Sequence, residues 1–283
     1  MKKINQDQKE FWNEKKGKIW VSLEKHIDKM LNPLGDHAIK TLEPKDGEKI
    51  LDVGCGTGST TQNLSKLVGE SGLITGMDIS EPILDFAKKQ SNFKKINNIN
   101  FILADAQDFQ FLTKSYDAIF SRFGIMFFED PIAAFKNIKK SLKNKGRLTF
   151  ICWRKREEND WITLSSNIAS NFLELPPNAN PKEPGPFALE DSGYIEEILI
   201  KSGWKNITIK NHNQNIIVGE TANITAEFLS RMGPMSVPFE NADEYTQRKV
   251  KEALKECYSK YDTSNGVEFN FSTWIISAFN YQD

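Results

Sequence analysis

Residues 49–60, Lys-Ile-Leu-Asp-Val-Gly-Cys-Gly-Thr-Gly-Ser-Thr, constrain the fold of this chain more than any other stretch. The mostly apolar run at 50–53 is typical of a buried strand. Glycines follow at alternate positions, where they let the backbone turn tightly and let a ligand approach it; they are Gly54, Gly56 and Gly58. Ser59 is then placed to cap a helix. A strand, a glycine loop and a helix in this order form the first unit of a doubly wound α/β domain.

The glycine spacing separates two classes of nucleotide-binding domain. The dinucleotide fingerprint is Gly-x-Gly-x-x-Gly, whereas this loop is Gly-x-Gly-x-Gly, and the strand before it carries an acid, Asp52. The string resembles motif I of class I S-adenosylmethionine (SAM)-dependent methyltransferases, which reads Leu-Asp-x-Gly-Cys-Gly-x-Gly. The resemblance implies a Rossmann-like core that binds SAM as its cofactor. A nicotinamide-dependent oxidoreductase is the alternative.

Hydrophobic runs before and after the glycines predict the strands of a sheet. Alternation of these runs with helical patterns predicts a mostly parallel sheet with right-handed crossovers. The resemblance implies a seventh strand that closes the sheet antiparallel, for which 272–279 is the candidate. The expected class is α/β, a doubly wound seven-stranded sheet with an N-terminal helical lid and helical insertions. The expected strands are 50–53, 73–78, 99–104, 116–121, 147–153, 204–210 and 272–279.

The sequence divides into four expected segments, and the first precedes the core. Residues 1–45 are expected to form an N-terminal helical lid, with a helix over 5–31 that is interrupted near Gly17 and ends at Asn32-Pro33. The alternative is that this segment simply packs on the sheet. The other expected segments are the SAM-binding core at 46–153, an irregular proline-rich cap or loop at 154–190, and the remainder of the core at 191–283 with a helical insertion at 220–262.

The composition argues against several classes of partner. With 37 basic and 38 acidic residues the formal net charge is −1, so no global attraction to nucleic acid or an anionic membrane is expected. Cys55, Cys152 and Cys257 are well separated and form no Cys-x-x-Cys pair, which argues against a disulfide framework and a zinc site, and we expect no metal. No signal peptide and no membrane-spanning run of about 18 apolar residues are evident. We therefore expect a cytoplasmic monomer or homodimer.

Acidic residues at the ends of successive strands are the candidates for binding the cofactor. Asp78 lies 20 residues after Gly58, where an acid can accept hydrogen bonds from ribose hydroxyls; the alternative is a helix-capping or solvent-facing Asp. The resemblance implies that Asp105 binds the adenine amino group. Asp52 could bind the ammonium group of SAM, either directly or through a water molecule. Cys55 is interpreted as a packing residue rather than a nucleophile. The full set of expected cofactor-binding residues is Asp52, Gly54, Cys55, Gly56, Gly58, Asp78, Ile79, Asp105, Ala106 and Ser121.

The stretch 121–128, Ser-Arg-Phe-Gly-Ile-Met-Phe-Phe, follows the fourth strand, where this fold usually meets its acceptor. Aromatic faces attract a sulfonium cation and make a dry pocket. The alternative is that these residues are ordinary core. The expected pocket residues are Trp20, Phe123, Met126, Phe127, Trp153 and Phe187.

Two residues are candidates for chemistry at the acceptor. Arg122 could pair an acidic group on the acceptor, or it could form an ion pair with Glu129 or Asp130. His26 flanks the apolar face of the N-terminal helix and is a candidate base, with a structural role as the alternative. Methyl transfer is an in-line displacement in which positioning and exclusion of water can supply much of the rate, so a general base is not obligatory.

Over residues 46–153 the chain resembles the small-molecule branch of class I methyltransferases, in the style of ubiquinone and menaquinone biosynthesis methyltransferases. The resemblance implies transfer of a methyl group from SAM to O, N, S or C of a small molecule in a largely apolar pocket, with S-adenosylhomocysteine (SAH) as the product. Two other functions stay open: methylation of RNA or protein, and a non-catalytic SAM-binding module.

Overall fold

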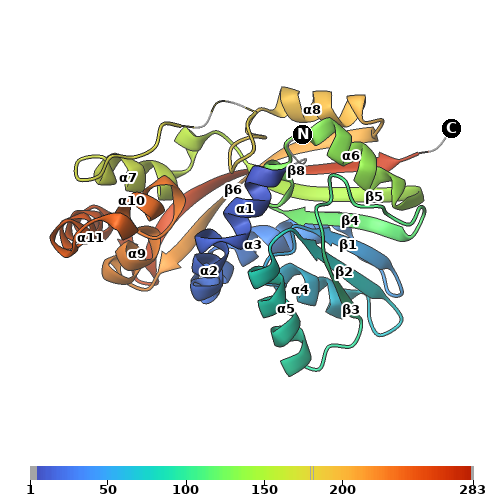
Figure 1. Ribbon diagram of the computed structural model, residues 1–283, viewed down its shortest axis with the longest axis horizontal. Helices are drawn as coiled ribbons and strands as arrows, with labels where there is room; N and C mark the ends of the chain where they lie inside the picture. Colours follow the sequence, from blue (N-terminus) through green and yellow to red (C-terminus); the bar gives the residue numbers. More distant parts are fainter. Residues whose placement is uncertain (1–4, 179, 181, 282–283) are drawn as a thin grey trace.

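Helices cover both faces of a mixed sheet in the computed structural model, which describes residues 5–178, 180 and 182–281 (Figure 1). Within those residues the strand order is β3-β2-β1-β4-β5-β8-β6, and β7 pairs with β8 outside this path. The strands are β1 Lys49–Val53, β2 Leu73–Asp78, β3 Ile99–Leu103, β4 Tyr116–Arg122, β5 Leu142–Trp153, β6 Lys205–Gly219, β7 Asp262–Thr263 and β8 Gly266–Asn280.

The helices are α1 Gln6–Asn13, α2 Lys15–Ser22, α3 Glu24–Leu42, α4 Ser59–Leu67, α5 Glu81–Phe93, α6 Pro131–Lys140, α7 Asp160–Ala169, α8 Ser192–Lys201, α9 Ala222–Leu229, α10 Ser236–Asn241 and α11 Glu244–Tyr258. Short 3₁₀ turns are η1 Ile125–Phe127, η2 Arg156–Glu158, η3 Gly233–Met235 and η4 Ser259–Tyr261. The helix α3 packs on β4, β5, β6 and β8, whereas α4 packs on β1, β2 and β3.

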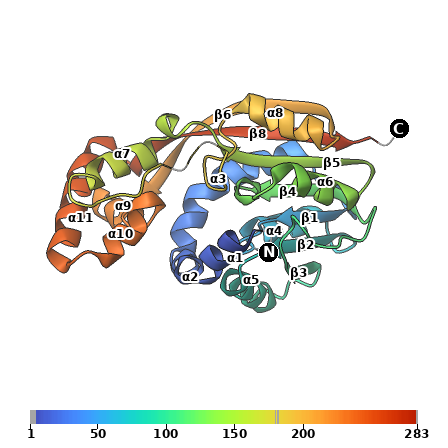
Figure 2. The same ribbon diagram turned by 45° about the horizontal axis from the view of Figure 1, so that its top comes forward.

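The strand directions confirm the predicted fold class. Strands β1 to β5 pair in parallel, and β8 runs antiparallel to both β5 and β6. The order reverses at β1, because β2 and β3 lie on one side of it and β4 and β5 on the other. Right-handed crossovers then place α4 and α5 on one face and α6 on the other (Figure 2). The carboxyl ends of β1 and β4 meet at this switch point, where open α/β sheets bind their ligands.

The N-terminal helices differ from the prediction. The breaks between them fall at Glu14 and Leu23, and Gly17 lies inside α2. The prediction that a helix ends at Asn32-Pro33 is also wrong, because α3 continues through Pro33. A proline inside a helix costs about 3 kcal/mol. The flanking side chains of α3 are buried in the core, at roughly 1.5–3 kcal/mol each, and this burial outweighs the cost; they include Met30, Leu31 and Leu34.

The segment 154–190 contains the helix α7, so the prediction of an irregular segment is wrong in part. The buried face of α7 is short and half polar, and Ser165 on this face shares a 2.6 Å hydrogen bond with Tyr258 of α11. The local pattern is therefore weak, and packing against a distant segment stabilises the helix. The helical insertion expected at 220–262 is present and contains α9, α10 and α11, and with α7 these helices gather at one end of the molecule (Figure 1).

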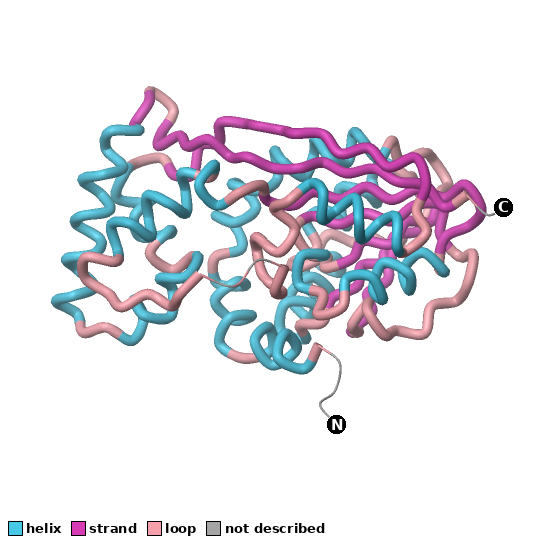
Figure 3. Tube along the Cα trace, turned by 90° about the horizontal axis from the view of Figure 1, so that it is seen from above, coloured by secondary structure: helices cyan, strands magenta, loops and turns pink. Residues whose placement is uncertain are grey.

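The strands β6 and β8 are longer than the sequence predicts. The polar run His212–Asn215 of β6 pairs with Asn270–Thr273 of β8. Asn residues are depleted in strands, so the partner strand rather than the local sequence determines the length of β6. These strands extend the sheet toward the helical end of the molecule (Figure 3). Within the described ranges, no helix is both long and apolar enough to span a membrane.

Candidate cofactor and acceptor site

The loop between β1 and α4 has the left-handed backbone that its glycines permit. Gly54, Gly56 and Gly58 have φ angles of +68°, +56° and +85°. The N–H groups of Gly54 and Cys55 donate to the Met77 carbonyl of β2 at 2.8 and 3.0 Å. On the other side, a Cβ added to Gly54 would lie 2.7 Å from the Cα of Gly124. The loop is therefore held between the carboxyl ends of β2 and β4.

Ser59 does not cap α4, so this prediction is wrong. The N-cap residue is Gly58, whose left-handed conformation already turns the chain into the helix. The Ser59 hydroxyl instead donates to Oδ1 of Asn32 in α3 at 3.0 Å. Ser80 occupies the N-cap position of α5, and its hydroxyl donates to the Trp12 carbonyl at 2.7 Å. Both hydroxyls thus connect the core to the N-terminal helices.

Asp52 is fully buried in β1, and its two carboxylate oxygens differ. Oδ2 accepts hydrogen bonds from the hydroxyls of Thr60 and Thr61 at 2.8 and 2.7 Å. Oδ1 is buried and has no hydrogen-bond partner in the described part of the chain. Burial raises the pKa of Asp52 to about 6, although the two hydroxyls and Arg122 oppose the rise. A buried acceptor without a partner is unfavourable, and Oδ1 therefore fits an ammonium group brought by a ligand.

Asp78 and Asp105 follow β1 along the same edge, at the end of β2 and just after β3. Asp78 accepts the N–H groups of Gly56 and Ser80 at 2.8 and 2.9 Å, and each of its oxygens keeps a second lone pair for a ribose hydroxyl. Asp105 accepts the N–H of Gln107 at 2.9 Å through Oδ1. Its buried Oδ2 makes no hydrogen bond of ordinary geometry with the described residues, although the Asn5 side chain opposes the rise that burial causes in the pKa of Asp105. This second unpartnered oxygen fits an amino group such as that of adenine.

The other cofactor candidates lie at the same edge and offer no free polar side chain. Burial raises the pKa of the Cys55 thiol well above its ordinary value, which keeps the thiol protonated and fits a packing role. The Ser121 hydroxyl donates to the Val53 carbonyl at 2.7 Å and joins β4 to β1. Ala106 is buried and Ile79 is half-buried. Contact of these residues with the cofactor stays a prediction.

The helices α1 and α2 lie over the glycine loop. The side-chain amide of Asn13 donates to the Ile79 carbonyl after β2 at 2.9 Å. In α2, the indole nitrogen of Trp20 lies 3.9 Å from the point where a Cβ on Gly56 would be. The helix α3 instead packs on the sheet. The packing alternative therefore describes α3, whereas the role of α1 and α2 as a lid stays a prediction.

Gly17→Ala tests how closely α2 fits this site. A Cβ at this position would lie 2.2 Å from the Trp12 carbonyl oxygen and 3.0 Å from the Ser80 hydroxyl, so α1 or α2 must shift. We expect a loss of about 1–3 kcal/mol of stability and weaker SAH binding, measured by urea unfolding and calorimetry. In the control Gly185→Ala the nearest atom to the new Cβ is 3.8 Å away, and neither quantity should change. Equal stability and equal SAH affinity of the two variants would contradict the close packing of α2 against α1 and Ser80.

Arg122, at the end of β4, is bound by α3. Its Nη1 donates to Asn32 Oδ1 at 2.6 Å, and its Nη2 lies 3.2 Å from Asp28 Oδ1. The side chain is only 9% exposed, and a Cβ on Gly35 would come within 2.8 Å of its Cδ. Because Asn32 also accepts from Ser59, Arg122 helps to join β4, α3 and α4. Its predicted role toward an acceptor stays a prediction.

The alternative ion pairs of Arg122 are wrong. Glu129 accepts the backbone N–H of Asn5, which precedes α1. Asp130 is the N-cap of α6 and accepts the N–H of Ala133 at 2.9 Å. Both acids are exposed.

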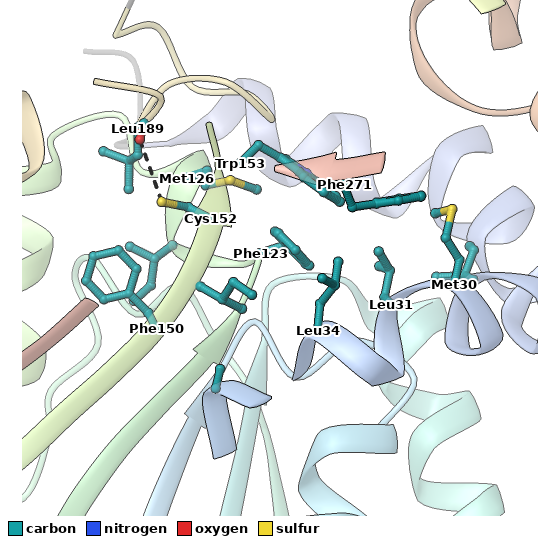
Figure 4. Close-up of a cluster of buried hydrophobic side chains, with 14 of the residues drawn as sticks. Met30, Leu31, Leu34, Phe123, Met126, Phe150, Cys152, Trp153, Leu189 and Phe271 are labelled. Carbon is teal, nitrogen blue, oxygen red and sulfur yellow. Dashed lines mark hydrogen bonds between the residues drawn. The ribbon is translucent and has the colours of Figure 1, made fainter. Parts of the chain in front are cut away.

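Aromatic side chains form a wall that begins beside the glycine loop. Phe123 is next to Gly124, and its ring stacks on Trp153 of β5 with centroids 4.1 Å apart. Trp153 in turn contacts Trp161 of α7 and Phe271 of β8, with centroids 5.2 and 5.9 Å apart. Figure 4 shows Phe123, Trp153 and Phe271 in a buried cluster that also contains Leu34 of α3. We call Phe123, Trp153, Trp161 and Phe271 the aromatic wall.

The backbone of Phe123 is strained. Its φ angle is +58°, which is a genuine outlier for a bulky residue and costs roughly 1–3 kcal/mol. In this conformation the N–H of Phe123 donates to the Ile151 carbonyl at 3.0 Å while the ring lies on Trp153. Strain of this kind clusters at functional sites, which supports the choice of Phe123 as a pocket residue.

The other predicted pocket residues lie in three places. Phe127 meets Trp12 of α1 edge to face, with centroids 5.3 Å apart. Met126 is buried, and its carbonyl accepts the N–H of Gly185 at 3.1 Å. The thiol of Cys152 in β5 donates to the Leu189 carbonyl (Figure 4). The segment 185–189 is therefore held at both of its ends. Phe187, between these anchors, lines a cavity of about 350 Å³ beside α8.

His26 lies on the exposed side of α3 and stacks on Phe228 of α9, with centroids 5.3 Å apart. Lys29, one turn further along α3, pairs with Glu220 at 3.5 Å. This side of α3 therefore connects it to the helical end of the molecule. A role for His26 as a base stays a prediction.

Several residues that shape the site were missed in the sequence. Thr60 and Thr61 follow the loop directly, so two hydroxyls after a motif with a buried acid were a usable signal. Gly124 was visible only as a glycine after an apparent strand. Nothing local marks Asn32 or Trp161, because both reach the site through tertiary packing.

Comparison with known families agrees with this geometry. The methyltransferase domain model matches residues 44–198, which is more than half of the chain, and the chain belongs to this family. This membership confirms the predicted class, the SAM-dependent methyltransferases, and SAM as their cofactor.

Relatives in this family match part of the chain. Aklanonic acid methyltransferase DauC from Streptomyces sp. (strain C5) is 28% identical over 152 residues, which cover 54% of this chain and 64% of that protein. Demethylmenaquinone methyltransferase from Staphylococcus haemolyticus is 38% identical over 112 residues, which cover 40% and 46%. The chain thus spans about half the length of the curated relatives that it matches.

Solved structures share the fold. The YcgJ protein from Bacillus subtilis has a TM-score of 0.58 at 14% identity, with 88% of this chain and 98% of that chain covered. A SAM-dependent methyltransferase from Aquifex aeolicus has a TM-score of 0.54 at 17% identity, with 93% and 97% covered. At these identities the likeness concerns the fold alone, and it agrees with the sheet order described above.

Proposed function

We propose that this chain is an enzyme that transfers a methyl group from SAM to a small, planar, largely apolar acceptor. The aromatic wall beside the glycine loop carries this proposal. Phe123 is adjacent to Gly124, and Gly124 lies against Gly54 of the loop over which we expect the methionine part of SAM. An acceptor packed against Phe123 and Trp153 would therefore lie close to the methyl group.

Different residues of the site would bind the cofactor and orient the acceptor. Asp52 would hold the ammonium group through Oδ1, Asp78 the ribose, and Asp105 the adenine amino group through Oδ2. When bound, SAM would supply a methyl group activated by its sulfonium sulfur, and SAH would be the leaving group as the acceptor atom takes the methyl. The aromatic wall would orient the acceptor, and α1 and α2 would exclude water above the loop.

The relatives and the charge support a small-molecule acceptor. The two relatives are named for aklanonic acid and demethylmenaquinone, both small molecules. The formal net charge of −1 gives no support to a nucleic-acid acceptor. Methylation of RNA or protein, and SAM binding without turnover, are the competing functions.

A panel of acceptors with one ring system tests the proposal and the acceptor atom together. The protein would be incubated with SAM and 1-naphthol, 1,4-dihydroxynaphthalene, 1-naphthylamine or 1-naphthalenethiol, and in parallel with total RNA. We expect SAH release and a methylated naphthalene product by mass spectrometry. Methylation of the RNA alone would contradict a small-molecule acceptor. Tight SAM binding without any methylated product would favour the non-catalytic module.

A further inference from the structure

We infer that the indole N–H of Trp161 recognises an oxygen atom of the acceptor. The acceptor is then a planar aromatic molecule that bears a carbonyl or hydroxyl oxygen. This inference rests on the proposed function, because it names one contact within the same acceptor site.

The first observation is an unpartnered donor. Trp161 is only 6% exposed, and its Nε1 is buried without a hydrogen-bond partner in the described part of the chain. An indole nitrogen can only donate, and the N–H of a buried Trp usually finds a partner. The missing partner is therefore an acceptor atom, and an oxygen of a bound molecule would supply it.

The second observation is that Trp161 is fixed in place. Asn159, two residues earlier, exchanges two hydrogen bonds with Ser272 of β8, at 2.9 and 3.2 Å. Ser165, one turn later, shares its hydroxyl with Tyr258 of α11. With both ends of this turn held, α7 cannot easily rotate to give Trp161 another partner, so the partner must come to it.

The third observation is the position of Trp161 on the aromatic wall. Its ring is nearly parallel to that of Phe271, with an angle of 7° and centroids 6.0 Å apart, and it contacts Trp153. The wall is continuous from Phe123, beside the glycine loop, to Trp161. A fused-ring acceptor packed along it would carry its reacting atom at the loop end and an oxygen at the Trp161 end.

Trp204 provides a matched control. It is 2% exposed, and its Nε1 also lacks a partner among the described residues. It precedes Lys205, which lies opposite Phe279, and Phe279 pairs on its other side with Arg147 of β5. Trp204 therefore lies near the amino ends of the parallel strands, at the opposite edge from the glycine loop. Trp204→Phe removes the same N–H without touching the wall.

Two probes isolate the proposed hydrogen bond. The SAH-loaded wild type, Trp161→Phe and Trp204→Phe would be titrated with 9-fluorenone and with fluorene, planar molecules that differ in one carbonyl oxygen. We expect the wild type and Trp204→Phe to prefer fluorenone by about three- to tenfold, the range of one neutral hydrogen bond. We expect Trp161→Phe to bind both probes equally, with its fluorene affinity unchanged.

Three results would overturn the inference: no preference in the wild type, a preserved preference in Trp161→Phe, or no binding of either probe to the SAH-loaded protein. Should Trp161→Phe fail to fold, ¹⁵N-indole spectra of the wild type provide the test, since one indole proton must shift with fluorenone and not with fluorene. The proposed function is tested separately in the same titrations, because failure to load SAH would count against the cofactor site and not against Trp161.

Discussion

Asp52→Asn is expected to weaken SAH binding by roughly 10- to 100-fold near neutral pH. The buried Oδ1 of Asp52 lacks a hydrogen-bond partner among the residues that the structure describes, and a hydrogen bond between a carboxylate and an ammonium group contributes about 1.5–3 kcal/mol. The unliganded variant should be as stable as the wild type or more so, because a buried charge is removed while an oxygen can still accept from Thr60 and Thr61. Calorimetry and thermal unfolding measure the two effects.

The control is Asp117→Asn, which alters an acid of β4 that pairs with Lys143 at 2.7 Å near the amino end of the strand. It should leave SAH affinity unchanged. Equal SAH affinities of the wild type and Asp52→Asn would contradict the assignment of Asp52 to the ammonium group.

The same residue predicts a pH dependence. The pKa of Asp52 is raised from 3.8 to about 6 by burial, and only its ionised form attracts an ammonium group. SAH affinity should therefore fall as the pH falls through 6 and level off above it, and the Asp52→Asn profile should be flat over this range. Stability of the unliganded protein has the opposite sign. Between pH 3.8 and 6 the folded state keeps a proton that the unfolded state has lost, so the contribution of this group to stability decreases as the pH rises.

Gly54→Ala is expected to cost about 2–5 kcal/mol of unfolding free energy. An alanine at φ +68° is strained by roughly 1–2 kcal/mol, and its Cβ would lie 2.7 Å from the Cα of Gly124. A clash with backbone cannot be relieved by a side-chain rotation, so overpacking adds about 1–3 kcal/mol. Urea unfolding measures the loss.

Gly47→Ala is the matched control for Gly54→Ala. Gly47 has a φ of +78°, and the nearest described atom to a Cβ there is the Ser71 hydroxyl oxygen, at 3.5 Å. The loss of unfolding free energy in Gly47→Ala should therefore come from backbone strain alone. Equal losses of unfolding free energy in the two variants would mean that the close contact between Gly54 and Gly124 adds nothing to the cost of a Cβ at Gly54.

The core of the fold was predictable because its signals are local. The strand 73–78 is observed with the predicted bounds, since an apolar run lies between a glycine and an acid. The continuation of α3 through Pro33, the helix α7 and the length of β6 were not predictable in this way. In each case burial or pairing with a distant segment outweighs the local preference, and a single sequence shows only the local preference.

The candidate site shows the same division. Asp52, Asp78 and Asp105 were identified because parallel strands end at one edge of a sheet, so that strand prediction also positions the acids. The partners of Arg122 could not be identified from the sequence. Asp28 lies 94 residues away in sequence, and no spacing rule connects a strand end to a preceding helix. Trp161 was missed because the helix that positions it was not predicted.

Calorimetric titration of the unmodified protein with SAM, SAH and NADH tests the central claim most directly. The unpartnered oxygens of Asp52 and Asp105 beside the glycine loop predict that SAM and SAH bind at one site per chain and that NADH does not. Binding of NADH, or no binding of either SAM or SAH, would contradict this account of the site.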